Sequence, residues 1–598
     1  MSRVVDSYSD VEMACPSDVE NGHKEPFVKR PGTGIRRASN RRTGEWTGST
    51  YETEFIDDGR FRQQLVSPVD RYWQGAHVVK MTNRANRAAK GAWYTVFTGP
   101  LIDAQPTRPK GMSVTLGDLV SSLILSDQAI LPYRIIGDGM LGQLTSVSEN
   151  LDLQTPEPTI YGQHRRVPDV DVASQFGFCV LPTYLGIQDV SATAYHVWLV
   201  AGHACADIPT WRVDGSDRSA DEGTQWMVPH WPSHNAQFGA VYNDYVDNFG
   251  ITRRYTLIRG LVTDMFADEA DLTDPDACAL GRRQLTVAVD GVESVGDGSG
   301  ECELDRIQQY KHWMVNYVAH RGADSYHSGD WLTCPLWDAF GASIAMIDLA
   351  SFDACSALGV IRLPDAGGSP AVTPGYIGAA VIGANGERAS VRDWIAAWNR
   401  SCDVQNVITR YGQYRVFMMS PTETIKAAAP LYTDVLDILK DSFDTVLDWP
   451  GQVFRVPFQG DKNPATGVWT TSDSAVNTTV RDLYGGTEKT SETIDYPYAP
   501  GITALNHLAQ IELHRSLHPA STIGLRAPVG PNHNDDSLAY LEAGDYIRYK
   551  AFPAVATSAT EIRLAQLVSI GVDVERREVI AEAIDCEDLI GYDRPGSP

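Results

Sequence analysis

The chain has 598 residues, of which 43% are hydrophobic and 21% are charged. Such a length exceeds what one hydrophobic core supports and predicts roughly three to five domains. The formal net charge of −26 argues against a nucleic-acid-binding surface over most of the chain, because phosphate contacts need clustered lysine and arginine side chains.

Cysteine spacing and hydropathy bear on the compartment. The nine cysteines are scattered, and their odd number without a Cys-x-x-Cys pair predicts neither a disulfide framework nor a zinc site. The first residues lack an apolar signal-peptide core, and no apolar run approaches about 18 residues, so neither export nor membrane spanning is expected. We therefore expect synthesis in a reducing cytoplasm and mostly buried free thiols.

Residues 1–48 are expected to form an N-terminal basic arm. Six cations lie between Lys29 and Arg42, with almost nothing apolar to bury. One interpretation is a solvated or disordered tail. The other is an arm that orders against an acidic neighbouring chain through its interaction residues Arg36, Arg37, Arg41 and Arg42. Nucleic-acid binding ranks third, because no aromatic residues interleave the arginines.

The next two segments read mainly as strands. Aromatic and β-branched residues separated by polar turns predict strands at residues 51–56, 71–81 and 93–104, and Thr115 with Asp118 predicts the start of a helix over 116–125. A second β-rich module is expected at about 158–250. Its last part, residues 225–250, is rich in tryptophan, histidine and tyrosine and resembles a loop.

Helices and strands mix in the remaining sequence. Strands are expected at 255–262 and 284–289, followed by a helix over 305–320 whose apolar residues recur at spacings of three and four. Ser390 and Asp393 form a capping box for a helix at 391–401. Trp394 and Trp398 lie one turn apart in this helix, so both are expected to be core residues. A hairpin over 404–419 should follow.

The C-terminal fifth predicts a helix over 502–517 and a final hairpin. Val568, Ile570, Val572 and Val574 alternate with polar residues, which is the period-two pattern of a half-buried strand. Residues 575–578 form the expected turn before a strand at 578–585. No candidate catalytic group lies on this hairpin, so it is expected to pack as part of a small barrel.

The sequence contains partial matches to catalytic and metal-binding motifs, but the surrounding residues do not fit any of them. The residues Gly296-Asp-Gly-Ser-Gly300 place serine wrongly for a nucleophile elbow. Pro232 interrupts the spacing of His230 and His234, and His196 and His203 belong to no metal-binding motif. A cluster of acids over 264–276 misses the calcium-loop pattern, although a weak structural calcium stays open. We therefore nominate no catalytic residue, no metal ligand and no cofactor, and expect no enzyme.

Several blocks of the sequence resemble, in the same order, the baseplate hub or tail tip proteins of long-tailed bacteriophages and gene transfer agents. The resemblance implies a β-rich multidomain α+β fold, with two tail-tube-like β-barrel domains, α+β insertions and a small C-terminal β-barrel. The blocks are Trp93-Tyr-Thr-Val-Phe-Thr-Gly-Pro100, Thr159-Ile-Tyr-Gly-Gln-His164, the strand ending in Ala201-Gly-His203, the helix and hairpin over 390–416, and Gly544-Asp-Tyr-Ile-Arg-Tyr549.

The resemblance also implies a function and partners. The expected function is that of a structural virion protein, a homotrimeric hub that closes the distal end of the tail tube at the tail tip, or baseplate, of the virion. The expected partners are the distal tail protein, the tape measure protein and tail fibre or spike proteins, with transient passage of phage DNA during genome ejection. The C-terminus ends soon after Tyr592, so a fused receptor-binding or enzymatic domain is not expected.

Two alternative functions compete with that of the hub. They are a tailspike or fibre-tip adhesin that binds or hydrolyses glycans, with residues 225–250 as the sugar platform, and a cellular carbohydrate-binding module. Absence of repeats disfavours the first alternative, and the missing signal peptide disfavours the second.

The expected domain division follows the changes in sequence pattern. The expected domains are a basic arm at 1–48, a first β-barrel hub domain at 49–157, an inserted β-rich domain at 158–250, a second hub region at 251–375, a helix-plus-hairpin domain at 376–500 and a C-terminal helix and β-barrel at 501–598.

Overall fold

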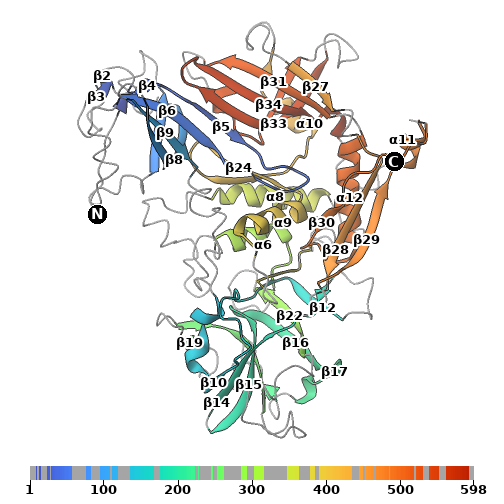
Figure 1. Ribbon diagram of the computed structural model, residues 1–598. Coiled ribbons are helices and arrows are strands. Elements are labelled where there is room, and N and C mark those ends of the chain that lie inside the picture. The colour runs from blue at the N-terminus through green and yellow to red at the C-terminus, as the bar shows by residue number, and fades with distance from the viewer. Residues whose placement is uncertain are drawn as a thin grey trace.

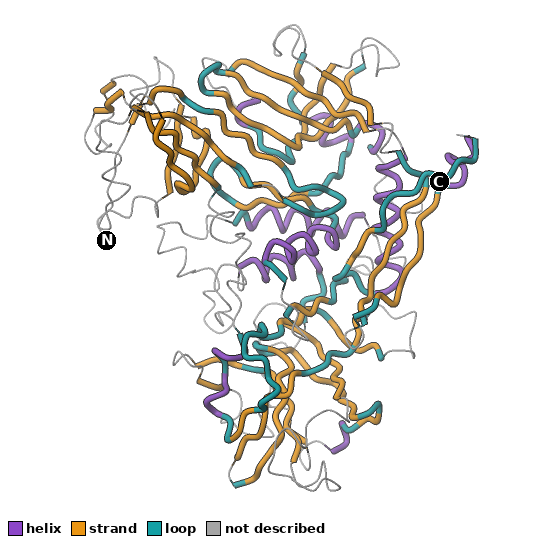
Figure 2. The backbone as a smooth tube through the Cα atoms, in the orientation of Figure 1, coloured by secondary structure: helices purple, strands orange, loops and turns teal. Residues whose placement is uncertain are grey.

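Strands from both ends of the chain meet in the computed structural model of this protein (Figures 1 and 2). The residues that the structure describes are 8–9, 13–14, 23–26, 28–46, 48–56, 76–81, 94–107, 111–118, 135–167, 176–190, 192–221, 226–227, 244–246, 252–261, 285–292, 302–315, 347–362, 377–383, 389–433, 444–448, 452–463, 467–483, 485–517, 520–529, 538–550 and 561–590.

A 12-stranded sheet is the largest element of the fold. Its main path runs from β27 to β7, and β5 lies in the middle, hydrogen-bonded to the C-terminal β33 on one side and to β6 on the other. The strands of that path are β27 (Asp444–Asp448), β31 (Ala520–Pro528), β34 (Glu578–Asp585), β33 (Ile562–Asp573), β5 (Thr33–Arg37), β6 (Thr50–Ile56), β9 (Gly111–Gly117), β8 (Tyr94–Thr107) and β7 (Ala76–Met81). Off it, β4 (Val28–Arg30) pairs with β6, and β32 (Tyr546–Lys550) joins β33 to β26 (Leu431–Tyr432).

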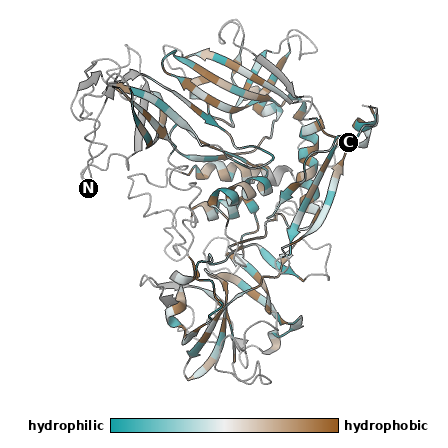
Figure 3. Ribbon diagram, viewed as in Figure 1, coloured by the Kyte–Doolittle hydropathy of each residue, from teal (hydrophilic) through white to brown (hydrophobic). Residues whose placement is uncertain are grey.

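Alternation of side chains gives this sheet one buried face. Ile570 and Val572 are buried in β33, and Val579, Ala581 and Ala583 are buried in the paired strand β34. Figure 3 shows the matching alternation of hydrophobic and hydrophilic residues along these strands. The ladder is irregular between Leu567 and Ser569, so Val568 does not belong to the alternation that the sequence predicts.

A separate two-sheet module lies at the bottom of Figure 1. Trp198, Val200, Trp211 and Val287 come from both sheets and share one buried cluster. One sheet consists of β10 (Ser146–Val147), β14 (Thr183–Val190), β15 (Thr193–Ala201), β21 (Thr256–Leu261) and β18 (Trp226–Met227). The other consists of β13 (Gly177–Phe178), β12 (Gln163–Arg166), β22 (Leu285–Val292), β16 (Cys205–Val213) and β17 (Ser216–Asp217).

Three helices form the centre of the molecule, between the large sheet and the lower module (Figure 1). They are α6 (Arg306–Trp313), α8 (Leu349–Arg362) and α9 (Val391–Cys402). The capping box at α9 is present, because the Ser390 side chain accepts from the Asp393 amide and the Asp393 side chain accepts from the Ser390 amide. The next strands, β24 (Gln405–Ile408) and β25 (Tyr414–Phe417), form the expected hairpin.

Aromatic side chains fill the space between these helices. Trp394 and Trp398 are 2% and 0% exposed, so both lie in the core. The Trp398 ring stacks on Tyr310 with centroids 5.4 Å apart and contacts Tyr498 at 4.5 Å. Trp313 lies against both tryptophans. Burial of these large rings holds three helices together through one cluster.

A smaller unit combines a helix with a three-stranded sheet. Helix α12 (Gly501–Leu517) buries Leu505, Leu508 and Leu513 in a cluster with Val456 and Phe458 of the sheet. This sheet has the order β29 (Trp469–Val476), β28 (Arg455–Lys462) and β30 (Ile494–Tyr496). The short helices α10 (Glu423–Ala428) and α11 (Thr478–Leu483) precede and follow its first two strands.

Further short strands pair outside the larger sheets. Strand β11 (Thr159–Tyr161) pairs with β23 (Ala380–Ile382), and β19 (Asp244–Val246) pairs with β20 (Thr252–Arg254). Near the N-terminus, β3 (His23–Pro26) lies between β1 (Tyr8–Ser9) and β2 (Met13–Ala14).

The β-rich α+β fold expected from the sequence is confirmed, with several sheets and few helices. Among the described strands no pairing joins β27 to β7, so the large sheet is not a closed barrel. It takes strands from the ranges 1–48, 49–157, 376–500 and 501–598, which the sequence analysis assigns to four different domains.

Two expectations need correction. The helix expected over 116–125 is wrong at its start, because Leu116 and Gly117 are the end of strand β9. The structure also differs from an arm over residues 33–46, since β5 is a central strand of the large sheet and Trp46 is 3% exposed. A strand between two neighbours satisfies its backbone groups on both sides, which an isolated arm cannot do.

Candidate functional site

The face of the large sheet opposite its core carries acidic side chains. In the β6–β9 ladder Tyr51 and Thr53 are buried, whereas Glu52 and Glu54 occupy the alternate positions and pair with Thr115 and Ser113. Because side chains alternate across a strand, these glutamates lie on the face away from the core. In the next ladder Asp103 of β8 pairs with Thr115, on the same face as Glu52.

The same face continues across the C-terminal strands. Asp573 pairs with Glu578, and Ser569 pairs with both Glu582 and Arg37. The acidic face, as we call it, is the part of this outer face on β5, β6, β8, β9, β31, β33 and β34. It has six carboxylates and two guanidinium groups, a formal balance of −4, and Arg548 and Lys550 of β32 lie beyond it on the same side of the sheet. Its members are Glu52, Glu54, Asp103, Asp573, Glu578 and Glu582, with Arg37 and Arg526.

The acidic face costs stability rather than adding to it. Asp573 and Glu578 are opposite each other across the ladder, and like charges so placed are destabilising. Asp573 also lies 3.8 Å from the exposed Arg576 guanidinium, a pair that contributes little, and elsewhere on the face Glu54 and Asp103 accept hydrogen bonds from Thr107 and Gln105. The charge pattern is therefore explained better by a role at the surface than by folding.

A second site lies where the N-terminal segment crosses from the large sheet to the helices. We call residues 38–46 the strap. Its backbone is held at each step, because Ala38 donates to Val568 O, Ser39 donates to Asn406 O, and Thr43 O accepts from Arg400. Gly44 has a φ of +68°, and a Cβ there would lie 2.3 Å from Ala396 O, so this position needs glycine.

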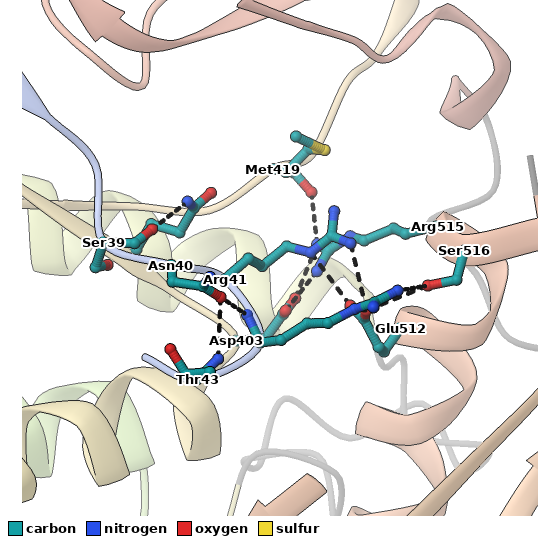
Figure 4. A network of polar contacts seen from close by, with 11 residues as sticks. Ser39, Asn40, Arg41, Thr43, Asp403, Met419, Glu512, Arg515 and Ser516 are labelled. Carbon is teal, nitrogen blue, oxygen red and sulfur yellow. Dashed lines mark hydrogen bonds and ion pairs between the residues drawn. The ribbon is translucent and has the colours of Figure 1, made fainter. Parts of the chain in front are cut away.

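An ion-pair cluster fixes the strap to α12 (Figure 4). Arg42 Nε lies 2.7 Å from one Glu512 oxygen, and Arg41 Nε lies 3.2 Å from the other. Arg515, on the same helix, binds Asp403 just beyond the end of α9 and donates to Met419 O at 3.0 Å. The cluster thus connects the strap, α9 and α12.

Burial and charge act in opposite directions on Glu512. Burial alone would raise the pKa of its carboxyl group, but Arg41, Arg42 and Arg515 outweigh burial, so the pKa lies below its ordinary value. The carboxylate is therefore ionised at neutral pH and depends on its arginines for compensation.

Arg36 is the other buried cation of the N-terminal segment. Its Nε lies 3.0 Å from Glu542 Oε2, and its Nη1 donates to Val96 O at 3.1 Å. Arg410 approaches the same carboxylate at 3.6 Å, with its guanidinium against the rings of Tyr94 and Tyr540. Glu542 is therefore shared by two arginines from distant parts of the chain.

The four arginines expected at an interface with a neighbouring chain have separate positions. Arg36, Arg41 and Arg42 pair with carboxylates of their own chain, and a contact of these residues with an adjacent chain stays a prediction. Arg37 is exposed on the acidic face. The intrachain pairs form because Glu512 and Glu542 are buried and need a countercharge within the fold.

The histidines of the sequence analysis do not form a metal site. His196 and His203 are buried and bond to Tyr184 and to backbone groups, respectively. His230, His234, the acidic run 264–276 and most of the aromatic segment 225–250 lie outside the described residues. Within the described part of the chain, no group of three or more histidine, cysteine or acidic side chains could hold a metal ion. Nor do the described helices include one long and apolar enough to cross a membrane.

We expect the free energy of unfolding to fall as the pH is lowered from about 6.5 to about 4. Burial lowers the pKa of His196 from 6.5 to about 4, so the unfolded chain binds an additional proton within this window. Urea unfolding at a series of pH values measures the effect. In His196→Gln the fall should be smaller, and an unchanged pH profile would contradict the assignment.

The sequence did not point to the two buried glutamates that pair with these arginines. Glu512, which binds the strap, lies in the helix predicted over 502–517, and Glu542, which binds Arg36, lies just before the block Gly544–Tyr549; acidic residues are usually solvated. Burial alternates along β5, with Gly34 and Arg36 buried and Ile35 half-buried. The sequence does not show this alternation, because an arginine occupies a buried position and an isoleucine a half-buried one.

No family model matches the chain, and no curated protein matches it. Similar solved structures include a chain from the virion of a native gene transfer agent particle, with 13% identity and a TM-score of 0.37 over 74% of this chain and 86% of that one. The 43 kDa tail protein of prophage MuSo2 from Shewanella oneidensis gives 9% identity and a TM-score of 0.31 over 93% of this chain and 94% of that one.

A tail protein from Neisseria meningitidis MC58 is also similar, with 10% identity and a TM-score of 0.25 over 53% of this chain and 78% of that one. These neighbours are virion and tail proteins by their descriptions. Because every one of these TM-scores is below 0.5, the likeness does not by itself assign a function to this chain.

Proposed function

We propose that this protein is a structural component of a phage-type tail, a homotrimeric hub at the tail tip. It closes the distal end of the tube and connects it to the distal tail protein, the tape measure protein and tail fibres or a spike. It is made in the bacterial cytoplasm and has no enzymatic activity. The ordered sequence blocks and a strand-rich fold tied together by buried ion pairs support a mechanical role.

The acidic face is the observation that carries this proposal. A wall past which DNA moves must not bind phosphate, and clustered carboxylates repel phosphate over about one Debye length, roughly 8 Å at physiological salt. The acidic face has six carboxylates and two arginines on an extended sheet. We therefore propose that the acidic face lines the passage for DNA in the trimer.

We expect charge reversal on this face to create DNA binding. The double variant Glu52→Lys, Glu582→Lys should retain double-stranded DNA about tenfold more strongly than the wild type at low salt, with the retention lost as salt rises. Gel shift over a salt series measures it. The control Asp482→Lys, Glu488→Lys makes the same charge change at exposed residues outside the acidic face. Equal DNA binding by both variants would overturn the assignment of the face.

The trimer and the absence of catalysis are tested separately. Light scattering of the full-length protein, and cryo-EM of tails that contain it, should show three copies in a ring, because a heterologous interface is stable only when it closes. Monomers or dimers in the assembled tail would refute the hub. A zymogram with peptidoglycan or capsular polysaccharide should show no clearing band, and a band lost on mutation of one carboxylate would favour a lytic enzyme.

A further inference from the structure

Strand β29 is a sheet edge that nothing in the described part of the chain covers. It is the terminal strand of its sheet and pairs only with β28. Of its eight residues, Thr470, Ser472, Asp473 and Val476 are exposed. Helix α12 packs on one face of this sheet and leaves the edge open. An edge of this kind presents unpaired backbone amides and carbonyls.

The register identifies which backbone groups point outward. Asn477 N donates to Phe454 O at 3.0 Å, so that pair is hydrogen-bonded, and the bonded pairs of an antiparallel ladder alternate with non-bonded ones. The backbone groups of Ser472, Ser474 and Val476 therefore face away from β28. Pro457, which has no amide hydrogen, is opposite Ser474 in agreement with this assignment.

Little protects this edge against another strand. The strand has no proline, and Asp473 is its one charged residue. The Asp473 carboxylate accepts from the Ser474 amide at 2.7 Å, which leaves the outward amides of Ser472 and Val476 without a partner among the described residues. Exposed valines are at or near both ends, with Val468 60% and Val476 37% exposed. The outward backbone amides and carbonyls recur at every second residue, which is the spacing that an added β-strand hydrogen-bonds to.

We propose that the edge of β29 pairs with strand β7 of a second copy of this chain. This inference rests on the proposed function, because a ring of identical copies needs a head-to-tail interface made of two different surfaces. Strand β7 is the last strand of the large sheet and pairs with β8, which Figure 1 shows on the side of the molecule opposite β29. Pairing would join the two sheets across the subunit boundary.

Charge favours β7 over the other end of the same sheet. The sequence of β7, Ala-His-Val-Val-Lys-Met, contains one lysine and no acidic residue, whereas the only charged residue of β29 is the acidic Asp473, so the two strands have opposite net charge. Strand β27 has two aspartates in its sequence, Asp444 and Asp448, and so has the same sign of net charge as β29. Like charges across a ladder are destabilising and opposite charges are favourable.

The full-length variant Ser472→Pro tests the pairing. Proline removes the outward amide of Ser472, which no described residue uses, and should weaken trimer association at least tenfold in a light-scattering dilution series. Ser472→Ala keeps the amide and should associate as the wild type does. Equal thermal unfolding of both variants shows that the fold is intact. A Ser472→Pro variant that is folded and associates normally overturns the proposal.

Hydrogen exchange gives a second readout that does not depend on a variant. In the wild-type trimer, the amides of Ser472 and Val476 should exchange at least tenfold more slowly than in the diluted monomer. The Asn477 amide, bonded to Phe454 within the chain, is the internal control and should not change. Trimers with unprotected β29 amides refute this interface and leave the proposed function standing. A protein that is monomeric in solution and in assembled tails refutes both.

Discussion

Replacing Trp398 by alanine is expected to lower the free energy of unfolding by about 3–5 kcal/mol, the usual cost of removing a large buried aromatic ring. Trp398 is 0% exposed and contacts Tyr310, Trp313 and Tyr498, which come from different segments of the chain. The resulting cavity cannot close without moving helices that also pack on other units. Urea unfolding followed by tryptophan fluorescence and circular dichroism measures the loss.

Tyr411→Ala is the control for this prediction. Tyr411 is also a large aromatic residue, but it is 55% exposed, so its removal should cost less than about 1 kcal/mol. Trp398→Phe should lie between the two, because it keeps a ring in the site. Equal stability of Trp398→Ala and the wild type would show that the central aromatic cluster is not as described.

Glu512→Gln is the second substitution with a large expected effect. It removes the carboxylate that compensates Arg41 and Arg42 at the crossing of the strap, and breaking a buried pair typically costs about 3–5 kcal/mol because a charge stays behind uncompensated. Arg42 is 38% exposed and Arg41 is 23% exposed, so water relieves part of the loss and the lower end of the range applies. Chemical unfolding at neutral pH measures it.

The matched control for Glu512 is Glu488→Gln. Glu488 also pairs with an arginine, Arg455, but the two side chains are 44% and 43% exposed, and such pairs contribute about 0–1 kcal/mol. Raising the salt concentration should destabilise the wild type more than Glu512→Gln, since salt screens the partly exposed Arg42 contact. Similar losses in Glu512→Gln and Glu488→Gln would mean that the strap is not held by this cluster.

The two predictions address different connections in the same fold. Trp398 holds the central helices to one another, whereas Glu512 holds the strap and thereby fixes α12 relative to α9. In the proposed tail-tip role, the chain has to transmit load between such units. We therefore expect tails assembled with Glu512→Gln to break at lower shear than tails assembled with Glu488→Gln.

Local pattern in the sequence was enough to predict several elements. The capping box at Ser390 and Asp393 gave the start of α9, and the alternation around Ile570 and Val572 gave the final hairpin. Burial of Trp394 and Trp398 followed from their spacing of one helical turn. These signals depend on residues a few positions apart, because the 3.6-residue period of a helix and the two-residue period of a strand determine which side chains share a face.

The tertiary structure alone decided how the elements combine. No local pattern shows that β5 inserts between β33 and β6, or that Arg41 finds Glu512 at a separation of 471 residues. The acidic face likewise exists only because the register of consecutive ladders brings Glu52, Asp103 and Glu582 to one side of a sheet. A strand or a charge can be recognised from its neighbours in sequence. The partner of that strand or charge depends on the arrangement of the whole chain. The most stable arrangement buries apolar surface and leaves no buried charge uncompensated.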